Sequence, residues 1–347
     1  MTPPGTMRAV QVTAPGRVEL RRVPVPEPGP GEVLVEVAAA GVCHSDLHLW
    51  HSPRIRSEPL TLGHEIAGTI VGGDGAPGTA GVVYLCFSCG RCGRCAQGRE
   101  NLCREAGRAA MPPAPGLGPA GGMADYVTVP GRAFVSTDID PVRAAPLADA
   151  GLTSQHAIDT AREHLVPGAT AVVLGVGGLG HVGLQILRAL APVRVVAVDT
   201  DPDARALAAR LGADQVLDGR DVEAVVARIL AATDGLGAEA VFDFVGLQQT
   251  AEIAVRTVAP GGAYRMVGLG GGDPGLAADG ALGDRWPWGA SVLKTYAGTR
   301  ADLHTVLTLA RQDLLAVHTE TFPLGEGPEV LSHLADGNIT GRAVLLP

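Results

Sequence analysis

The sequence predicts an α/β fold in which a β-rich part accompanies a parallel, doubly wound sheet. First, apolar strand and helix patterns alternate from Gly151 to about residue 297, a rhythm typical of βαβ units. Second, a glycine-rich turn joins one of those strands to the helix that follows it. Third, the residues before Gly151 form short strands with frequent glycine and proline. A chain of 347 residues is long enough for two domains.

The β-rich part is best marked by Gly31–Val37, where valine recurs at every second position as in a strand. Pro112–Gly122 is expected to be a loop because glycine and proline dominate it. The last fifty residues return to short elements, with a helix around Ala301–Arg311 and a strand at Ala343–Leu346.

The doubly wound part begins with a strand at Thr170–Leu174, which leads through the glycine turn into an apolar helix ending at Leu190. The elements expected after it are a strand at Val193–Val198, a helix at Pro202–Leu211, and strands at Val241–Phe244 and Tyr264–Val267. Their alternation predicts a parallel sheet.

Composition excludes several classes of protein. With 46% hydrophobic and 18% charged residues, the chain is neither disordered nor fibrous. A net charge of −9 without a basic cluster argues against nucleic acid and anionic membranes as partners. Ala169–Leu190 is apolar but carries five glycines and three polar side chains, so a buried strand, turn and helix explain it better than a membrane span. Met1–Gly5 has no apolar signal region, and we expect a cytoplasmic protein.

The glycine turn matches the dinucleotide fingerprint G-x-G-x-x-G, and it has the right context. It follows a strand and opens a helix, and Asp199 ends the next strand nineteen residues after the last glycine. Small residues let the backbone approach a pyrophosphate, which then lies at the helix N-terminus. A plain structural turn is the alternative. The residues of the predicted site are Gly175, Gly177, Gly178, Leu179, Gly180 and Asp199.

The charges after the second strand favour NAD over NADP. Asp199 is placed to accept hydrogen bonds from the adenosine ribose, and Asp201 and Asp203 add to its repulsion of a 2′-phosphate. The nearest cation, Arg205, falls on the following helix.

Five of the six cysteines fall within eighteen residues, which indicates metal rather than disulfides in a chain with no export signal. Cys89, Cys92, Cys95 and Cys103 have a spacing that suits a closed, tetrahedral structural zinc site. An iron–sulfur cluster is the rival, but its typical run has a shorter last gap followed by proline. Cys86 lies outside the pattern and is interpreted as a buried small hydrophobe.

Two further segments carry a family resemblance: G-V-C-H-S-D-L-H at residues 41–48 and G-H-E at residues 63–65. With the four cysteines, the glycine turn and Gly341-Arg342, they make the chain similar to the zinc-dependent medium-chain alcohol dehydrogenases over nearly its whole length. Closest are bacterial secondary-alcohol dehydrogenases, which the segments A-D-A-G-L-T (148–153), F-D-F-V-G (242–246) and H-T-E-T-F (318–322) resemble.

The resemblance implies a GroES-like catalytic domain made of residues 1–152 and 298–347, with the structural zinc lobe at 89–103. A Rossmann domain at residues 153–297 would be inserted into it. It also implies a catalytic zinc held by Cys43, His64 and Asp149. Most members have cysteine at the third place, but a carboxylate is an accepted zinc ligand of the same charge. The alternative for Asp149 is a surface or helix-capping carboxylate.

Other roles are carried over by resemblance to the family. Ser45 resembles the hydroxyl that takes the substrate proton, and His48 the outer end of its relay. Asp46 resembles an acceptor that orients a ligand histidine, and Glu65 the acid behind the zinc. The family's coenzyme contacts correspond to His44 and Arg342 at the pyrophosphate, and to Thr153, Val245, Val267, Gly268 and Leu269 near the nicotinamide.

The resemblance implies an NAD-dependent zinc oxidoreductase with two zinc ions per chain, acting on a secondary alcohol or ketone and also, as an option, on a primary alcohol or aldehyde. Alternatives are a biosynthetic reductase of another electrophile, such as an aldehyde or imine, and a non-catalytic zinc-binding protein. Family members form dimers and tetramers, and Ser291–Gly298 resembles their inter-subunit edge strand, so a homo-oligomer, with a homotetramer as one form, is expected.

Two features bear on substrate access. The stretch Val71–Val83 is shorter than in the family, so a strand connection there is expected to be rebuilt. Candidate pocket walls are Trp50, Trp286, Trp288 and Tyr296, for each of which ordinary packing is the alternative, and Ala297 replaces a second bulky aromatic.

Overall fold

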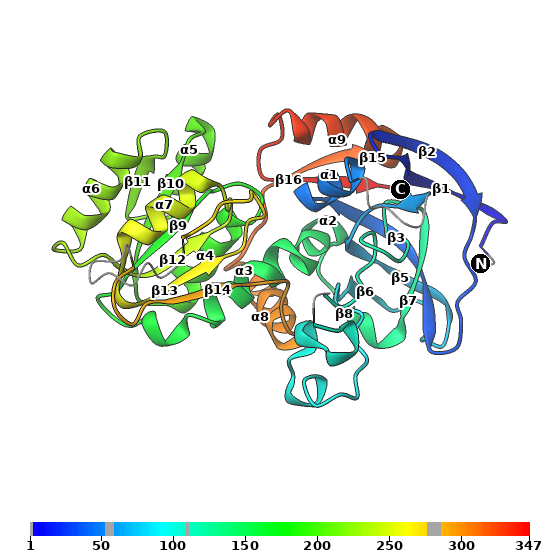
Figure 1. The fold of residues 1–347 in the computed structure, drawn as a ribbon. Coiled ribbons are helices and arrows are strands. Elements are labelled where there is room, and N and C mark those ends of the chain that lie inside the picture. The colour runs from blue at the N-terminus through cyan, green and yellow to red at the C-terminus, as the bar shows by residue number, and fades with distance from the viewer. Residues whose placement is uncertain (1–2, 53–58, 109–110, 276–285) are drawn as a thin grey trace. The chain divides into compact units, whose positions relative to one another are not determined.

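The computed structural model describes residues 3–52, 59–108, 111–275 and 286–347, which form two compact units (Figure 1). Unit 1 comprises Met1–Leu152, Ala297–Arg311 and Ala316–Pro347, and unit 2 comprises Thr153–Tyr296 and Gln312–Leu315. The ranges of these units differ from the expected domain ranges at residue 297 and at residues 312–315.

Unit 1 is built on a seven-stranded sheet in which β15, β16, β3, β5, β6 and β8 follow one another and β7 also pairs with β3. The strands are β3 (Glu32–Val42), β5 (Glu65–Gly73), β6 (Ala80–Val83), β7 (Tyr126–Pro130), β8 (Phe134–Ser136), β15 (Thr319–Pro323) and β16 (Arg342–Leu346). A smaller sheet contains β2 (Arg17–Pro24), β1 (Thr6–Ala14) and β4 (Leu60–Thr61). Apolar side chains of both sheets form one buried core.

The two ends of unit 1 meet in the larger sheet. β16 runs antiparallel to β3, with Ala343 opposite Val42, and parallel to β15. The helices of this unit are α1 (His44–Trp50), α2 (Pro141–Ala144), α8 (Arg300–Arg311) and α9 (Gly327–Ala335), with single 3-10 turns η1 to η5 and η7. Helix α3 (Ala150–Asp159) begins in unit 1 and continues into unit 2.

The short stretch 71–83 forms a closed hairpin. β5 and β6 are antiparallel neighbours, with Thr69 opposite Ala80, and residues 74–79 connect them. Gly73 has a φ of +81°, and a Cβ there would lie 2.3 Å from the Glu32 carbonyl oxygen, so only glycine fits this turn. Asp74 then accepts a 2.6 Å hydrogen bond from the Gly31 N–H, which ties the connection to the start of β3.

Unit 2 contains a six-stranded, wholly parallel sheet in the order β11, β10, β9, β12, β13, β14. The order reverses at β9, as in a doubly wound sheet with a switch point. The elements are β9 (Thr170–Leu174), α4 (Gly180–Leu190), β10 (Arg194–Asp199), α5 (Pro202–Arg210), β11 (Gln215–Asp218), α6 (Val222–Ala232), β12 (Ala238–Asp243), α7 (Gln248–Thr257), β13 (Val258–Met266) and β14 (Ser291–Lys294), with η6 (Arg162–His164) before β9.

Two predicted strands were too short. β3 extends past Val37 to Val42 through three alanines and a glycine, which have low strand propensity; Ala38 is exposed, but Ala39, Ala40 and Gly41 lie buried in the sheet between β5 and β16. β13 begins at Val258 rather than Tyr264, because Pro260, Gly261 and Gly262 hide its first half from a pattern search. Residues 112–122 contain no helix or strand, as expected of a loop. None of the described helices is long and apolar enough to be a transmembrane helix.

Candidate active site and metal centres

Three side chains of unit 1 converge where β3 meets α1. Cys43 lies between β3 and α1, His64 precedes β5, and Asp149 follows the 3-10 turn η5 (Ala145–Ala148). Gly41 makes this approach possible because it lies opposite Glu65, where a Cβ would come within 1.9 Å of the Glu65 Oε2. The turn of β3 into α1 therefore brings residues that are far apart in sequence into one cluster.

The geometry of this cluster fits a zinc ion. Asp149 Oδ2 lies 3.5 Å from the Cys43 Sγ and 3.4 Å from the His64 Nε2, and all three candidate ligand atoms lie within 4.8 Å of one another. Tetrahedral zinc ligands at about 2.0–2.3 Å from the ion are about 3.3–3.8 Å apart. Thiolate, imidazole and carboxylate are all zinc ligands, and three of them leave a fourth position open.

The surroundings of His64 provide a second observation that fits a metal site. It is 1% exposed, and neither ring nitrogen has a hydrogen-bond partner among the described residues. Its Nδ1 lies 3.6 Å from the Oδ1 of Asp46, a fully buried carboxylate. Asp46 is itself fixed, because its Oδ2 accepts from the Cys43 N–H at 2.9 Å and its Oδ1 from the Gly63 N–H at 3.3 Å. This leaves the His64 Nε2 directed at a ligand position, with Asp46 behind the ring.

Glu65 and Arg342 form a buried ion pair beside the cluster. Arg342 Nη2 lies 2.5 Å from the Glu65 Oε1 and 3.4 Å from the Asp149 Oδ2, and both partners of the pair are at most 2% exposed. Burial raises the pKa of Glu65 to about 8, although the Arg342 charge opposes that shift. Arg342, which the family resemblance assigns to the pyrophosphate, thus contacts two carboxylates within unit 1.

The predicted relay residues lie on α1. Ser45 Oγ is 3.7 Å from the Cys43 Sγ, so its hydroxyl adjoins the cluster. His48 is exposed and follows Ser45 by three positions, which puts both on the same side of the helix. His44, the first residue of α1, is also exposed.

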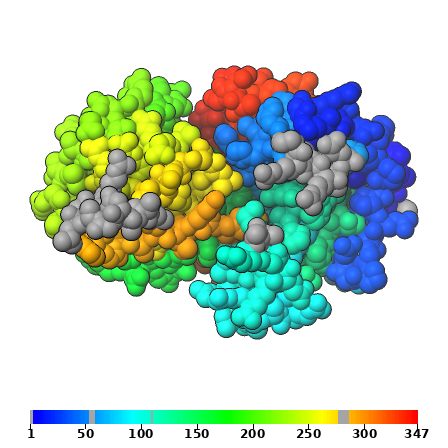
Figure 2. Space-filling view, viewed as in Figure 1, coloured from blue at the N-terminus to red at the C-terminus, as the bar shows by residue number. Residues whose placement is uncertain are grey.

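The four cysteines of the lobe at residues 89–103 form a second cluster in unit 1. Their sulfur atoms lie within 4.8 Å of one another, with Cys92 Sγ 3.5 Å and Cys89 Sγ 3.9 Å from the Cys95 Sγ. These separations also fit a tetrahedron of thiolates around zinc, about 3.8 Å on an edge. Figure 2 shows the lobe, in cyan, as a compact block at the surface of unit 1.

The lobe stabilises thiolates with backbone groups. The Cys89 N–H points to the Cys103 Sγ at 3.4 Å, and the Cys92 N–H to the Cys89 Sγ at 3.3 Å. Backbone N–H groups, that of Cys95 first, lower the pKa of Cys92 to about 6. Cys86 differs: it is 1% exposed, and burial raises the pKa of its thiol to about 12.

In unit 2, the glycine turn lies at the carboxyl end of the central strand β9. Gly175 has a φ of +83°, and a Cβ on Gly180 would lie 1.8 Å from the Gly175 carbonyl oxygen. The turn can therefore close only with glycine at both positions, and it leads directly into the N-terminus of α4, the kind of position at which a pyrophosphate binds. Asp199 Oδ2 accepts a 2.6 Å hydrogen bond from the Val176 N–H, which joins the end of β10 to the same turn.

The segments assigned to the nicotinamide meet beside this turn. Val245 and Gly246 follow β12, and Val267, Gly268 and Leu269 follow β13. A Cβ on Gly268 would lie 2.1 Å from the Val245 carbonyl carbon, and one on Gly175 2.3 Å from the Val245 Cγ2. Thr153 is buried on α3, whose next residue, Ser154, donates to the Leu179 carbonyl oxygen at 3.1 Å.

Sequence reasoning missed residues that shape the coenzyme site without a motif of their own. His181 is fully buried, with its Nδ1 2.8 Å from the Gly177 carbonyl oxygen. Asp243 is fully buried and contacts both loops near the nicotinamide segments. In the sequence, the signal for His181 was a histidine four positions after the fingerprint glycine Gly177. The signal for Asp243 was an acid at the end of an apolar strand.

The aromatic residues considered as pocket walls mostly pack locally. Trp286 stacks on Tyr264 in the core of unit 2, with ring centroids 6.1 Å apart, and Trp50 stacks on His51. Trp288 is 84% exposed.

Two family models match the chain. The alcohol dehydrogenase GroES-like domain matches residues 29–138, and the zinc-binding dehydrogenase model matches residues 178–312. The D-arabinose 1-dehydrogenase (NADP(+)) of Saccharolobus solfataricus is 33% identical, over 95% of this chain and 94% of that protein. The NAD-dependent alcohol dehydrogenase of Sulfurisphaera tokodaii is also 33% identical, over 98% of this chain and 99% of that protein.

Solved structures agree with these relatives. The alcohol dehydrogenase of Aeropyrum pernix has a TM-score of 0.86 at 33% identity, covering 98% of this chain and all of that one. The acetophenone reductase of Geotrichum candidum, solved with NAD, has a TM-score of 0.85 at 30% identity, covering 100% and 99%. The predicted GroES-like and Rossmann folds are thereby confirmed. The chain belongs to the zinc-binding alcohol dehydrogenase family, and it is an oxidoreductase of alcohols that uses zinc and a nicotinamide coenzyme.

Proposed function

We propose that this enzyme interconverts secondary alcohols and ketones with NAD(H). The observation that carries the proposal is the cluster of Cys43, His64 and Asp149, whose ligand atoms lie within 4.8 Å of one another. A structural relative of 30% identity is an acetophenone reductase, an enzyme named for a ketone, and was solved with NAD. The segments A-D-A-G-L-T and F-D-F-V-G support the same substrate class by their resemblance to secondary-alcohol dehydrogenases.

Two zinc ions per chain are part of this proposal. Cys43, His64 and Asp149 would hold one, and Cys89, Cys92, Cys95 and Cys103 the other. Bound in the three-ligand cluster, zinc supplies Lewis acidity that lowers the pKa of an alcohol hydroxyl and polarises a carbonyl. The four-thiolate lobe leaves no open ligand position, so its role is to stabilise unit 1.

The chain's own residues would orient the ligands and move the proton. Asp46 holds the His64 ring through its Nδ1 side, which keeps the other nitrogen available as a ligand. Ser45 would accept the substrate proton beside Cys43, and exposed His48 would deliver it to solvent.

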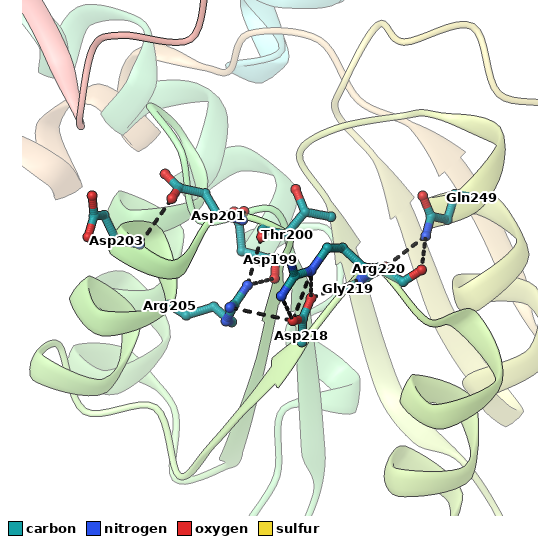
Figure 3. A network of polar contacts seen from close by, with 9 residues as sticks. All are labelled: Asp199, Thr200, Asp201, Asp203, Arg205, Asp218, Gly219, Arg220 and Gln249. Carbon is teal, nitrogen blue, oxygen red and sulfur yellow. Dashed lines mark hydrogen bonds and ion pairs between the residues drawn. The ribbon is translucent and has the colours of Figure 1, made fainter.

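The coenzyme would be held by the carboxyl edge of the parallel sheet in unit 2. The glycine turn would receive the pyrophosphate, and Asp199 would accept hydrogen bonds from the adenosine ribose. The nicotinamide provides hydride chemistry, and Val245, Val267, Gly268 and Leu269 would line its position. NAD is favoured by four carboxylates near the ribose position, those of Asp199, Asp201, Asp203 and Asp218 (Figure 3).

The proposal includes a homo-oligomeric state, dimer or tetramer. It also includes a cytoplasmic location. β14 pairs only with β13 among the described strands, and its other edge would pair with a second copy of the chain. All six cysteines are free, as expected in a reducing compartment.

The test is absorbance at 340 nm with NAD and a panel of secondary and primary alcohols, before and after zinc chelation. We expect turnover that is faster on secondary alcohols and lost on chelation. Cys43→Ala should abolish it, whereas Cys86→Ala, its matched control outside both clusters, should retain it. Absence of turnover with every alcohol and ketone, in protein carrying two zinc ions, would contradict the proposal.

A further inference from the structure

The carboxyl ends of β10 and β11 carry two aspartates side by side. Asp199 and Asp218 are register partners of these parallel strands, and the Gly219 N–H donates to the Asp199 carbonyl oxygen at 3.0 Å. Asp199 is the residue proposed to bind the adenosine ribose, so Asp218 lies next to the same coenzyme position. The sequence fingerprint assigns no role to Asp218, which falls nineteen residues beyond its acid.

Asp218 binds two arginines (Figure 3). The Arg220 Nε donates to both carboxylate oxygens, at 2.9 and 3.0 Å, and its Nη2 also contacts Oδ2. The Arg205 Nη2 lies 3.5 Å from the same Oδ2. These contacts, that with Arg220 first, hold the pKa of Asp218 well below its usual range, so the carboxylate keeps its charge at any pH at which the enzyme is assayed.

Backbone carbonyl groups hold Arg205 directly, and a side chain of α7 holds the turn that carries Arg220. The Arg205 Nη1 donates to the carbonyl oxygens of Asp199 and Thr200, at 3.0 and 2.8 Å. Gln249, at the start of α7, donates to the Gly219 carbonyl oxygen at 2.7 Å and thereby holds the turn that carries Arg220. Figure 3 shows the two guanidinium groups on either side of the Asp218 carboxylate, close to Asp199 and Thr200.

This arrangement bears on coenzyme choice. A 2′-phosphate is distinguished from a ribose hydroxyl by its charge, and arginine is the side chain best suited to bind it. We propose that Asp218 is a second determinant of the preference for NAD: by pairing with Arg205 and Arg220, it withholds both guanidinium groups from the 2′-phosphate of NADP(H). The inference rests on the proposed coenzyme site and extends it to residues outside the fingerprint.

The experiment is fluorescence titration of the zinc-loaded enzyme with NADH and NADPH, which reads binding without turnover. Asp218→Asn keeps the size of the side chain and removes its charge, and the wild-type residue is 40% exposed, so the fold should tolerate the change. We expect NADPH to bind about tenfold or more tightly than to wild type, the effect of one gained charge-assisted contact. NADH binding should change less than about threefold, because its ribose hydroxyls carry no charge.

Two matched variants separate release of the arginines from loss of negative charge. Asp201→Asn removes the same charge at the same edge of the sheet, but Asp201 caps α5 through the Asp203 N–H and Asn preserves that cap. Its gain in NADPH affinity should be clearly smaller than that of Asp218→Asn. Asp214→Asn breaks a pair with Arg188 at the amino end of β11, with 39% exposure, and should change neither affinity.

The arginines are tested directly. Arg220→Ala in the wild type should leave NADPH binding unchanged, because that guanidinium is already paired, whereas in Asp218→Asn it should remove most of the gain. Equal gains from Asp201→Asn and Asp218→Asn would overturn the inference, as would a wild type that binds NADPH more tightly than NADH. A wild type that binds neither coenzyme would instead refute the proposed function, so the two failures are distinguishable.

Discussion

Asp149 is the residue on which the proposed catalytic zinc site depends most. Its Oδ2 contacts Cys43, His64 and Arg342. Asp149→Ala should lower the zinc content from two ions per chain to one, because a site left with two protein ligands binds zinc weakly. Metal analysis of dialysed protein measures this loss, and alcohol turnover should fall with it.

The conservative exchange at this position tests the ligand role itself. Asp149→Cys provides a thiolate of the same charge, so it should retain two zinc ions and part of the activity. A full complement of zinc in Asp149→Ala would rule out the ligand role and return Asp149 to the role of a capping or surface carboxylate.

Cys86 and the lobe residue Cys92 should differ in their reactivity with an alkylating agent. Burial raises the pKa of Cys86 to about 12, so its thiol stays protonated at pH 8, whereas backbone N–H groups lower the pKa of Cys92 to about 6. After zinc chelation, iodoacetamide should modify Cys92 first and leave Cys86 unmodified until the chain is unfolded. Peptide mass mapping reads the order, and early alkylation of Cys86 would contradict the assignment of this thiol to the core.

Elements of the coenzyme site owe their positions to Asp243. Its Oδ1 accepts from the N–H groups of Val245 and Gly246, at 3.0 and 2.8 Å, and its Oδ2 from the hydroxyls of Thr250 and Tyr264, at 2.9 and 3.0 Å. Its carbonyl oxygen accepts from the N–H groups that follow β13. Asp243 thereby contacts both loops, the one after β12 through its side chain and the one after β13 through its backbone carbonyl oxygen.

Asp243→Ala should lower the free energy of unfolding by about 3 kcal/mol, since it leaves several buried donors without acceptors. It should also weaken NADH binding, because the loop after β12 loses the carboxylate that accepts from its Val245 and Gly246 N–H groups. Asp243→Asn keeps an acceptor for the N–H groups and should recover most of both losses. Urea unfolding and NADH titration measure the two effects; unchanged NADH affinity in Asp243→Ala would show that the anchor is not needed for binding.

How far the sequence predicts each element depends on the range of its contacts. The glycine turn was recognisable because its requirements lie within six consecutive residues and one acid at a fixed distance. The anchoring by Asp243 was not, because its partners Thr250 and Tyr264 come from different elements. Similarly, Cys43 and His64 stood in family motifs, whereas the pairing of Asp149 with Arg342 depends on β16 lying beside β3.

The whole molecule is expected to assemble through the edge of its parallel sheet. Among the described strands, β14 pairs only with β13, and its Leu293 is 42% exposed. Leu293→Lys places a charge where a second copy would pair, so it should reduce the molecular mass in solution toward that of a monomer. Light scattering after size exclusion measures the mass, with Leu236→Lys, at 67% exposure in a turn, as control. A monomeric wild type would exclude this assembly.

The pairing of β3 with β16 also affects the order in which the two units refold. It joins residues about 300 positions apart, whereas the paired strands of unit 2 lie within about 70 positions of one another, and sheets with distant partners form more slowly. On dilution from denaturant, NADH binding by unit 2 should therefore recover before the metal cluster of unit 1, which needs both strands. For that interval the enzyme would hold its coenzyme without being able to turn over, and zinc present from the start would speed only the later phase.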